Sequence, residues 1–218
     1  MSRHACARLT PSQEAALATI ACGAVRNGSI TLLCGPRGVG KSTVLAHLVA
    51  SPRLAPRSIR CLDAASWAAS LTADRGDLPD IVVVDDAHLG DGDLLARLAA
   101  ACRNRPAGAA LVLAGEGRLF TLVSRDPRLE QAVHLRASLR PCALDEARPL
   151  LASALGAVAA GPAFDAALHT IHEIAGGIPA AMLRLADLAA VVAASRPDGS
   201  LTPADVETIH HRLSPLAA

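Results

Sequence analysis

The sequence contains very few aromatic side chains. Only 1% of its 218 residues are aromatic, tyrosine is absent, and Trp67, Phe120 and Phe164 are the complete set. Proteins that bind single-stranded nucleic acid by stacking its bases need several rings on one surface, so the sequence argues against that class. The hydrophobic fraction is nevertheless 51%. We therefore expect a substantial core built from alanine, leucine, valine and isoleucine.

Signatures of export and of membrane insertion are missing as well. The six cysteines, at positions 6, 22, 34, 61, 102 and 142, form no C-x-x-C pair and no compact cluster with histidine. This favours reduced thiols in a cytoplasmic protein over a disulfide framework or a zinc site. The N-terminus has no continuous apolar segment of the signal-peptide kind. The most apolar stretch, residues 149–164, is interrupted by Gly156, Gly161 and Pro162, so we expect no direct membrane insertion.

Lysine is almost absent. The 21 basic residues are 20 arginines and one lysine, Lys41. A coding preference for arginine explains the twenty, because either side chain supplies positive charge on a solvated surface, but it does not explain the exception. Lysine ends in a compact ammonium group that fits a narrow loop, whereas arginine ends in a rigid planar fork. The sequence therefore indicates that position 41 requires a slim cation.

Lys41 belongs to a phosphate-binding loop pattern, G-x-x-x-x-G-K-[ST]. The segment is "CGPRGVGKST", residues 34–43, which we call the P-loop. Its glycines let the backbone aim successive N–H groups at phosphate oxygens, and the following helix adds the positive end of its dipole. We expect Lys41 to bridge the β- and γ-phosphates of ATP and the Ser42 hydroxyl to ligate Mg2+. The expected nucleotide-binding residues are Gly35, Pro36, Arg37, Gly38, Val39, Gly40, Lys41, Ser42 and Thr43.

The segments around the P-loop alternate between strand and helix patterns. Apolar runs predict strands within residues 29–34, 57–64, 80–86, 109–115 and 131–137. Helices are expected over 12–25, where Thr10, Pro11 and Gln13 form a capping box, and over 42–50, around 67–71 and over 92–104. This order predicts an α/β fold, a doubly wound parallel P-loop sheet flanked by helices.

The pattern becomes entirely helical after Pro141. Helices are expected over residues 144–156, 162–177, 178–195 and 201–213. We therefore predict two domains: a P-loop nucleotide-binding α/β domain with an N-terminal helix over 1–141, and an all-α lid over 142–218.

The strand at "IVVVDD" ends in two acids. Such a hydrophobic strand with a terminal acid completes the site of many nucleotide-hydrolysing proteins. We expect Asp85 to hold Mg2+ and Asp86 to polarise the attacking water. Aspartate is one methylene shorter than glutamate, so we expect slow hydrolysis. Without a P-loop in the sequence, the same two acids would be interpreted as a helix cap before "AHLGDGD".

Together these motifs resemble the AAA superfamily of P-loop ATPases. Within it, the chain is similar to ExeA-like general-secretion ATPases and to TniB- and MuB-like transposition ATPases. The similarity is carried by "LTPSQEAAL", "VVVDDAHL", "LVLAGEGRL", "HLRASLRPCALDEA" and "EIAGGIPAAMLRLADLA". The resemblance implies an ATPase that uses ATP and Mg2+ as a homo-oligomer and acts on an unidentified protein partner.

The chain departs from the resembled group at three positions: the two sensor positions and the arginine finger. After the Gly-Gly-Ile-Pro turn, where the group carries a sensor 2 arginine, this sequence has Ala180, and Arg184 lies one helical turn further on. Arg184 is the candidate substitute, with a solvated helix face as the alternative. Sensor 1 is usually polar, and Glu116 is the residue nearest to its place.

A second departure concerns the arginine that reaches a neighbouring subunit. The resembled position before the fifth strand is Ala132, which leaves Arg125, Arg128 and Arg136 as candidates, and we take Arg128 into the expected catalytic set with Lys41. Such a finger contributes about 10³ to 10⁵ in rate in other P-loop enzymes. The turnover therefore depends on which arginine fills this role.

Charge bears on the choice between functions. Between Arg97 and Arg148 there are nine arginines and five acids, but the formal net charge is only +1. This favours an inter-subunit surface or a coding bias over a DNA track. Four functions remain open: a slow Mg-ATP-dependent switch or assembly factor, a module that binds ATP without hydrolysis and is read by a partner protein, an ATP-dependent DNA-binding regulator of the transposition type, and a phosphotransferase for a small molecule. The helical lid and the lack of an acceptor site make the phosphotransferase the least favoured.

Overall fold

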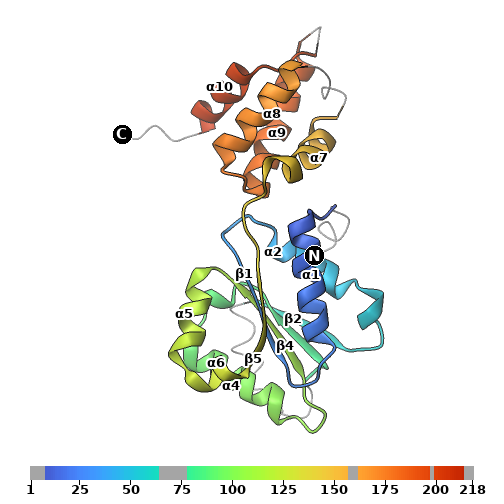
Figure 1. Cartoon of the computed structure of the whole chain (residues 1–218), viewed down its shortest axis with the longest axis vertical. Coiled ribbons are helices and arrows are strands. Elements are labelled where there is room, and N and C mark those ends of the chain that lie inside the picture. The colour runs from blue at the N-terminus through green and yellow to red at the C-terminus, as the bar shows by residue number, and fades with distance from the viewer. Residues whose placement is uncertain (1–7, 64–77, 157–161, 197–198, 214–218) are drawn as a thin grey trace. The chain divides into compact units, whose positions relative to one another are not determined.

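A computed structural model describes residues 8–63, 78–156, 162–196 and 199–213 (Figure 1). By their internal packing, the residues form two compact units, Met1–Arg140 and Pro141–Ala218. The first is an α/β unit and the second is helical. The helix expected around residues 67–71 lies outside the described residues.

The α/β unit is built on a parallel sheet of five strands. They are β1 (Ile30–Cys34), β2 (Ile59–Leu62), β3 (Ile81–Val84), β4 (Ala110–Gly115) and β5 (Val133–Ser138). Their order is β2-β3-β4-β1-β5, and every neighbouring pair is parallel. All residues of β1, β3 and β4 are buried, as expected for strands covered on both faces. The predicted fold class is confirmed.

Helices cover both faces of this sheet (Figure 1). On one face lie α1 (Pro11–Ala24) and α2 (Lys41–Val49), and on the other lie α4 (Gly92–Asn104), α5 (Gly117–Arg125) and α6 (Pro127–Ala132). Alternate strand residues therefore belong to two separate cores. The capping box of α1 is present as predicted: Thr10 accepts from the Gln13 backbone and Gln13 accepts from the Thr10 backbone. Short 3-10 turns lie at Pro52–Leu54 and Ala87–Leu89, the second of which is η2.

The described part of the helical unit contains α7 (Leu144–Leu155), α8 (Pro162–Ala175), α9 (Pro179–Ala194) and α10 (Pro203–Leu213). These helices pack around a common core, to which each contributes buried apolar residues such as Leu151, Ile171, Leu185 and Val206. Within the described residues, no helix is both long and apolar enough to cross a membrane.

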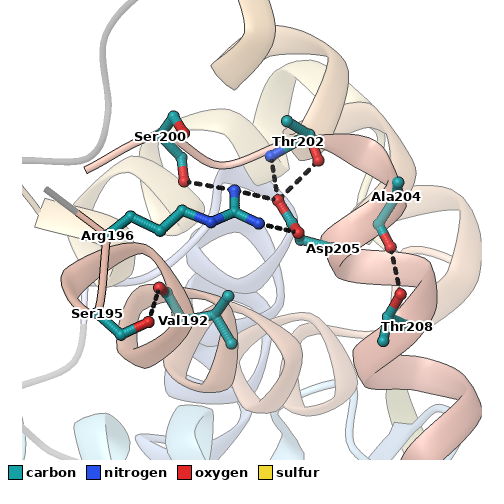
Figure 2. Close-up of polar contacts among 8 residues, drawn as sticks. All are labelled: Val192, Ser195, Arg196, Ser200, Thr202, Ala204, Asp205 and Thr208. Atoms are coloured by element: carbon teal, nitrogen blue, oxygen red, sulfur yellow. Dashed lines mark hydrogen bonds and ion pairs between the residues drawn. The ribbon is translucent and has the colours of Figure 1, made fainter. Parts of the chain in front are cut away.

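An ion pair joins the end of α9 to the first turn of α10 (Figure 2). Arg196 donates to Asp205 twice, from Nη1 to Oδ2 at 2.7 Å and from Nη2 to Oδ1 at 2.5 Å. Asp205 also accepts from the backbone N–H of Thr202 at 2.8 Å and from its hydroxyl at 2.7 Å. These donors, Arg196 foremost, lower the pKa of Asp205 to about 2. The carboxylate thus both caps α10 and holds it to α9.

Candidate nucleotide-binding site

The P-loop and the expected acidic site residues gather at one edge of the sheet. The P-loop follows β1, Asp85 and Asp86 follow β3, and Glu116 follows β4. These three strands are neighbours in the order β3-β4-β1, and all are parallel. Their carboxyl ends therefore meet at the same edge, where ligands of open α/β sheets bind.

The backbone of the P-loop has a positive φ at two positions, a conformation that favours glycine. Gly38 has a φ of 79° and Gly40 a φ of 101°. A Cβ at Gly40 would lie 2.2 Å from Nε2 of Gln13, and a Cβ at Gly35 would lie 2.7 Å from the carbonyl oxygen of Leu139. Both positions are therefore closed to side chains by their neighbours, and the loop keeps its shape because glycine occupies them.

Unpaired donors line this loop. Within the part of the chain that the structure describes, the backbone N–H groups of Arg37, Gly38 and Gly40 donate to no protein acceptor. Gly40 is the N-cap of α2 and provides no capping side chain, and the first turn of α2 has no acidic residue. The helix itself therefore supplies no acidic side chain to the positive end of its dipole. An anion at this place would receive several N–H donors at once.

Lys41 lies inside the loop rather than on the surface. Only 7% of its surface is exposed, and its Nζ donates to the carbonyl oxygens of Gly35 at 2.8 Å and Pro36 at 3.0 Å. The ammonium group is therefore satisfied by the loop itself. A phosphate in the loop would offer it stronger, charged acceptors.

Ser42 and Asp85 are brought together although they are far apart in the sequence. The Ser42 hydroxyl donates to Oδ2 of Asp85 at 2.6 Å. Asp85 is held by its own backbone, because its N–H donates to the carbonyl of Leu62 at 3.0 Å, and its Oδ1 accepts from the Asp86 N–H at 2.9 Å. The two expected metal ligands thus present adjacent oxygen atoms beside the P-loop.

Asp86 has an unusual backbone. Its φ is 50°, which makes it the one non-glycine residue with positive φ among those described. Aspartate tolerates this left-handed conformation better than most residues. Its carboxylate is 58% exposed, and Oδ1 lies 3.9 Å from Nδ1 of His88. The turn therefore places a largely exposed carboxylate beside His88, at the same edge of the sheet.

Two residues at this edge were not among the predicted site residues. Gln13 is buried, and its Nε2 donates to the carbonyl of Val39 at 3.0 Å, so it ties α1 to the P-loop. The sequence signalled Gln13 only as part of a helix cap. His88 lies between Asp86 and Glu116, with Nε2 3.7 Å from Oε1 of Glu116. His88 stands in the segment "VVVDDAHL", but its place beside Glu116 could not be predicted from that segment, because it depends on the fold.

The candidate arginines of the α/β unit are not gathered at the P-loop. Arg125 and Arg128 are exposed, and Arg136 is exposed and pairs with Glu130 at 3.6 Å. Because α6, which contains Arg128, leads directly into the amino end of β5, this helix lies toward the opposite edge of the sheet from the P-loop (Figure 1). Arg184 is exposed on α9 of the helical unit.

No protein-family model and no curated protein sequence matches the chain. Several solved structures, however, match the chain. The Holliday junction branch migration motor RuvB of Thermotoga maritima superposes with a TM-score of 0.64 and 21% identity, over 92% of this chain and 67% of that one. Hsp104, solved with ATPγS and casein, gives a TM-score of 0.65 and 16% identity, over 94% of this chain and 43% of that one.

A third similar structure is NtrX from Brucella abortus, solved in complex with ADP, with a TM-score of 0.65 and 15% identity over 97% of this chain. The chain spans 57% of NtrX, so it is considerably shorter than two of these three proteins. At these identities the likeness establishes the fold. The finer resemblance to secretion and transposition ATPases stays a prediction. The chain has the P-loop fold of the AAA+ ATPases.

Proposed function

We propose that the chain binds ATP with Mg2+ and hydrolyses it slowly, and that it works as a nucleotide-dependent switch or assembly factor. The observation that carries the proposal is the contact between Ser42 and Asp85 at 2.6 Å, beside a loop of unpaired N–H donors. A hydroxyl and a carboxylate next to a phosphate cradle are the groups that P-loop NTPases use for Mg-ATP.

The residues present suit Mg2+ better than a metal held by protein alone. Among the described residues, no group of three or more His, Cys, Asp or Glu side chains is arranged to hold a metal. Mg2+ usually takes one or two protein oxygens, with water and substrate phosphates completing its octahedron. Ser42 and Asp85 would supply these two oxygens. When bound, the ion would neutralise charge on the β- and γ-phosphates.

Asp86 supports hydrolysis rather than binding alone. Its side chain is 58% exposed, and the Ser42 hydroxyl donates to Asp85 instead, so the Asp86 carboxylate is available to accept a hydrogen bond from a water molecule. Its short side chain and its left-handed backbone restrict where that carboxylate reaches. Slow turnover follows from this restriction.

The switch role rests on the two units and on an assembly of several copies. In this proposal residues 1–141 bind the nucleotide, residues 142–218 form the lid, Arg184 senses the nucleotide, and Arg128 reaches a neighbouring subunit. The exposure of both arginines is compatible with these roles. Native mass measurement with and without ATP tests the assembly. An unchanged mass with ATP would contradict it.

DNA is the less favoured partner in this proposal. Several arginines of the basic stretch already pair with acids: Arg105 with Asp80 at 3.0 Å, Arg136 with Glu130, and Arg148 with Asp165. These pairs reduce the positive charge that is free for phosphate contacts. Adding duplex DNA to the mass measurement tests this directly, because a DNA-bound mass would favour the transposition-type alternative.

Thermal stability and phosphate release test nucleotide binding and hydrolysis separately. A ligand that binds only the folded state stabilises it by about 2.7 kcal/mol at a hundredfold excess over its Kd, so Mg-ATP should raise the melting temperature. Asp85→Asn should weaken this Mg2+-dependent shift. Asp86→Asn should keep the shift and lower phosphate release, and asparagine tolerates the left-handed backbone equally well.

Asp93→Asn provides a matched control, since Asp93 is an exposed acid on α4, seven residues beyond Asp86. Asp93→Asn should leave both the Mg-ATP shift in melting temperature and the rate of phosphate release unchanged. If Mg-ATP shifts the melting temperature but the parent releases no phosphate, the chain is a module that binds ATP without hydrolysis. Ala180 at the sensor 2 position and Ala132 at the finger position are the observations that favour this second function.

A further inference from the structure

His88 is held at the edge of the sheet by its main chain. Its carbonyl oxygen accepts from Nη1 of Arg118 at 2.9 Å. Gly115, the last residue of β4, packs directly against it, because a Cβ at Gly115 would lie 3.1 Å from both Cβ and N of His88. The side chain is only 11% exposed. The imidazole is therefore placed accurately without hydrogen bonds from its own ring.

The ring lies between two carboxylates that come from different strands. Nδ1 is 3.9 Å from Oδ1 of Asp86, and Nε2 is 3.7 Å from Oε1 of Glu116. Both distances are too long for hydrogen bonds. Nδ1 is buried and has no hydrogen-bond partner among the described residues. Leaving a buried polar atom without a partner is unfavourable, and native proteins retain few such atoms.

Asp86 is the group that can satisfy this nitrogen. Its carboxylate is 58% exposed, so it is free to move the short distance that separates it from Nδ1. Glu116, at 39% exposure, lies behind the ring at Nε2. The arrangement therefore offers Asp86 one preferred orientation, toward the imidazole, and the orientation of the imidazole depends on Glu116.

The chemistry of Glu116 supports an arrangement in which it acts on His88, and His88 acts on Asp86. An ionised carboxylate only accepts hydrogen bonds, so it has no donor for a γ-phosphate and would repel one. At the sensor 1 position Glu116 is therefore poorly suited to contact the nucleotide itself. The ring of His88 is a donor within its reach.

We propose that His88 is a positioning residue that, with Glu116 behind it, orients the Asp86 carboxylate toward the attacking water. This inference rests on the ATP hydrolysis proposed above. In it Asp86 contacts the water, whereas His88 and Glu116 act through Asp86. Loss of the ring should lower kcat and leave the binding of ATP unchanged, because neither nitrogen faces the P-loop contacts of Lys41 or Ser42.

Three substitutions of His88 separate positioning from packing. His88→Leu keeps an apolar body but removes both nitrogens, and we expect kcat to fall about tenfold or more, a part of the 10² to 10⁴ that a positioned acid or base contributes. The amide nitrogen of asparagine falls near Nδ1 of histidine, and that of glutamine falls near Nε2. His88→Asn should therefore retain more activity than His88→Gln, while KM stays within about twofold of the parent for all three.

Glu116→Gln completes a double-mutant cycle with His88→Leu. We expect it to lower kcat severalfold in the parent and to have no further effect in the His88→Leu background. The exposed pair His169 and Glu173 on α8, with Nδ1 and Oε2 3.3 Å apart, provides the control, and His169→Leu and Glu173→Gln should leave kcat unchanged.

The outcomes distinguish this inference from the proposed function. A parent protein that releases no phosphate would overturn the proposed hydrolysis and, with it, the basis of this inference. If the parent is active, a parental kcat in His88→Leu, or equal rescue by asparagine and glutamine, would overturn the role of His88 alone. An undiminished effect of Glu116→Gln in the His88→Leu background would show that Glu116 acts independently. If His88→Leu does not fold, the comparison of asparagine with glutamine decides.

Discussion

The contact between Gly40 and Gln13 allows a quantitative prediction about the P-loop. Gly40→Ala places a residue with a side chain at a φ of 101°, which costs about 1–2 kcal/mol in the left-handed region. The new Cβ would also lie 2.2 Å from Nε2 of Gln13, so this amide must move and lose its hydrogen bond to Val39 at 3.0 Å. Leaving these buried groups unpaired costs about 1–3 kcal/mol more. The expected total is about 2–5 kcal/mol.

Gly28→Ala is the matched control. Gly28 has a φ of 71°, but a Cβ there would meet nothing within 4 Å, so this variant should lose only the backbone contribution of about 1–2 kcal/mol. The assay is hydrogen exchange of the β1 amides, Ile30–Cys34, which reports the opening free energy of the α/β unit by itself. Gln13→Ala in the Gly40→Ala background removes the collision. The double variant should therefore lose less opening free energy than the sum of the losses in the two single variants. Equal losses in the two glycine variants would refute the reasoning.

Three further predictions concern other parts of the chain. Lys41→Arg should fold but lose most nucleotide affinity or turnover, because the guanidinium is too wide for the loop. Arg37→Lys, on the same loop, should keep both affinity and turnover. Full activity of the Lys41→Arg variant would mean that the lone lysine has no special role. Asp205 has a pKa lowered from 3.8 to about 2 in the folded state, so its stabilising effect is complete above about pH 4 and is lost as the pH falls through 2. The difference in urea midpoint between the parent and Asp205→Asn should therefore shrink over that range, and a constant difference would contradict the assignment. Burial raises the pKa of Cys34 to about 11, so at pH 8 only about one thiol in a thousand is ionised, and mass spectrometry should find iodoacetamide on the exposed Cys22 well before Cys34.

Local signals in the sequence predicted most of the fold. The P-loop, the strand at residues 81–84 and the helices after Pro141 are contiguous patterns, and all of them appear in the structure. Two short helices, α5 and α6, were missed because nine and six residues are too few for a periodic pattern. Asp126 followed by Pro127 was the available signal, since an aspartate cap with proline at the first position commonly begins a helix.

Contacts between distant residues could not be predicted. The strand order places β1 between β4 and β5, and no feature of a single sequence indicates those neighbours. The same limit applies to the site. Gln13 reads as a helix cap and His88 as part of a polar loop, and each acquires its contact with Val39 or Glu116 only when the sheet is assembled.

The strand order also has a consequence for synthesis of the chain. β1 is made early, but its partners on both sides, β4 and β5, are made roughly 80 and 100 residues later. At about 5–20 residues per second, a fully buried strand waits on the ribosome for about 4–20 s with both edges unpaired. Open, apolar strand edges are where nascent chains associate wrongly. The strand that precedes the P-loop therefore stays open to wrong association until residue 138 has emerged.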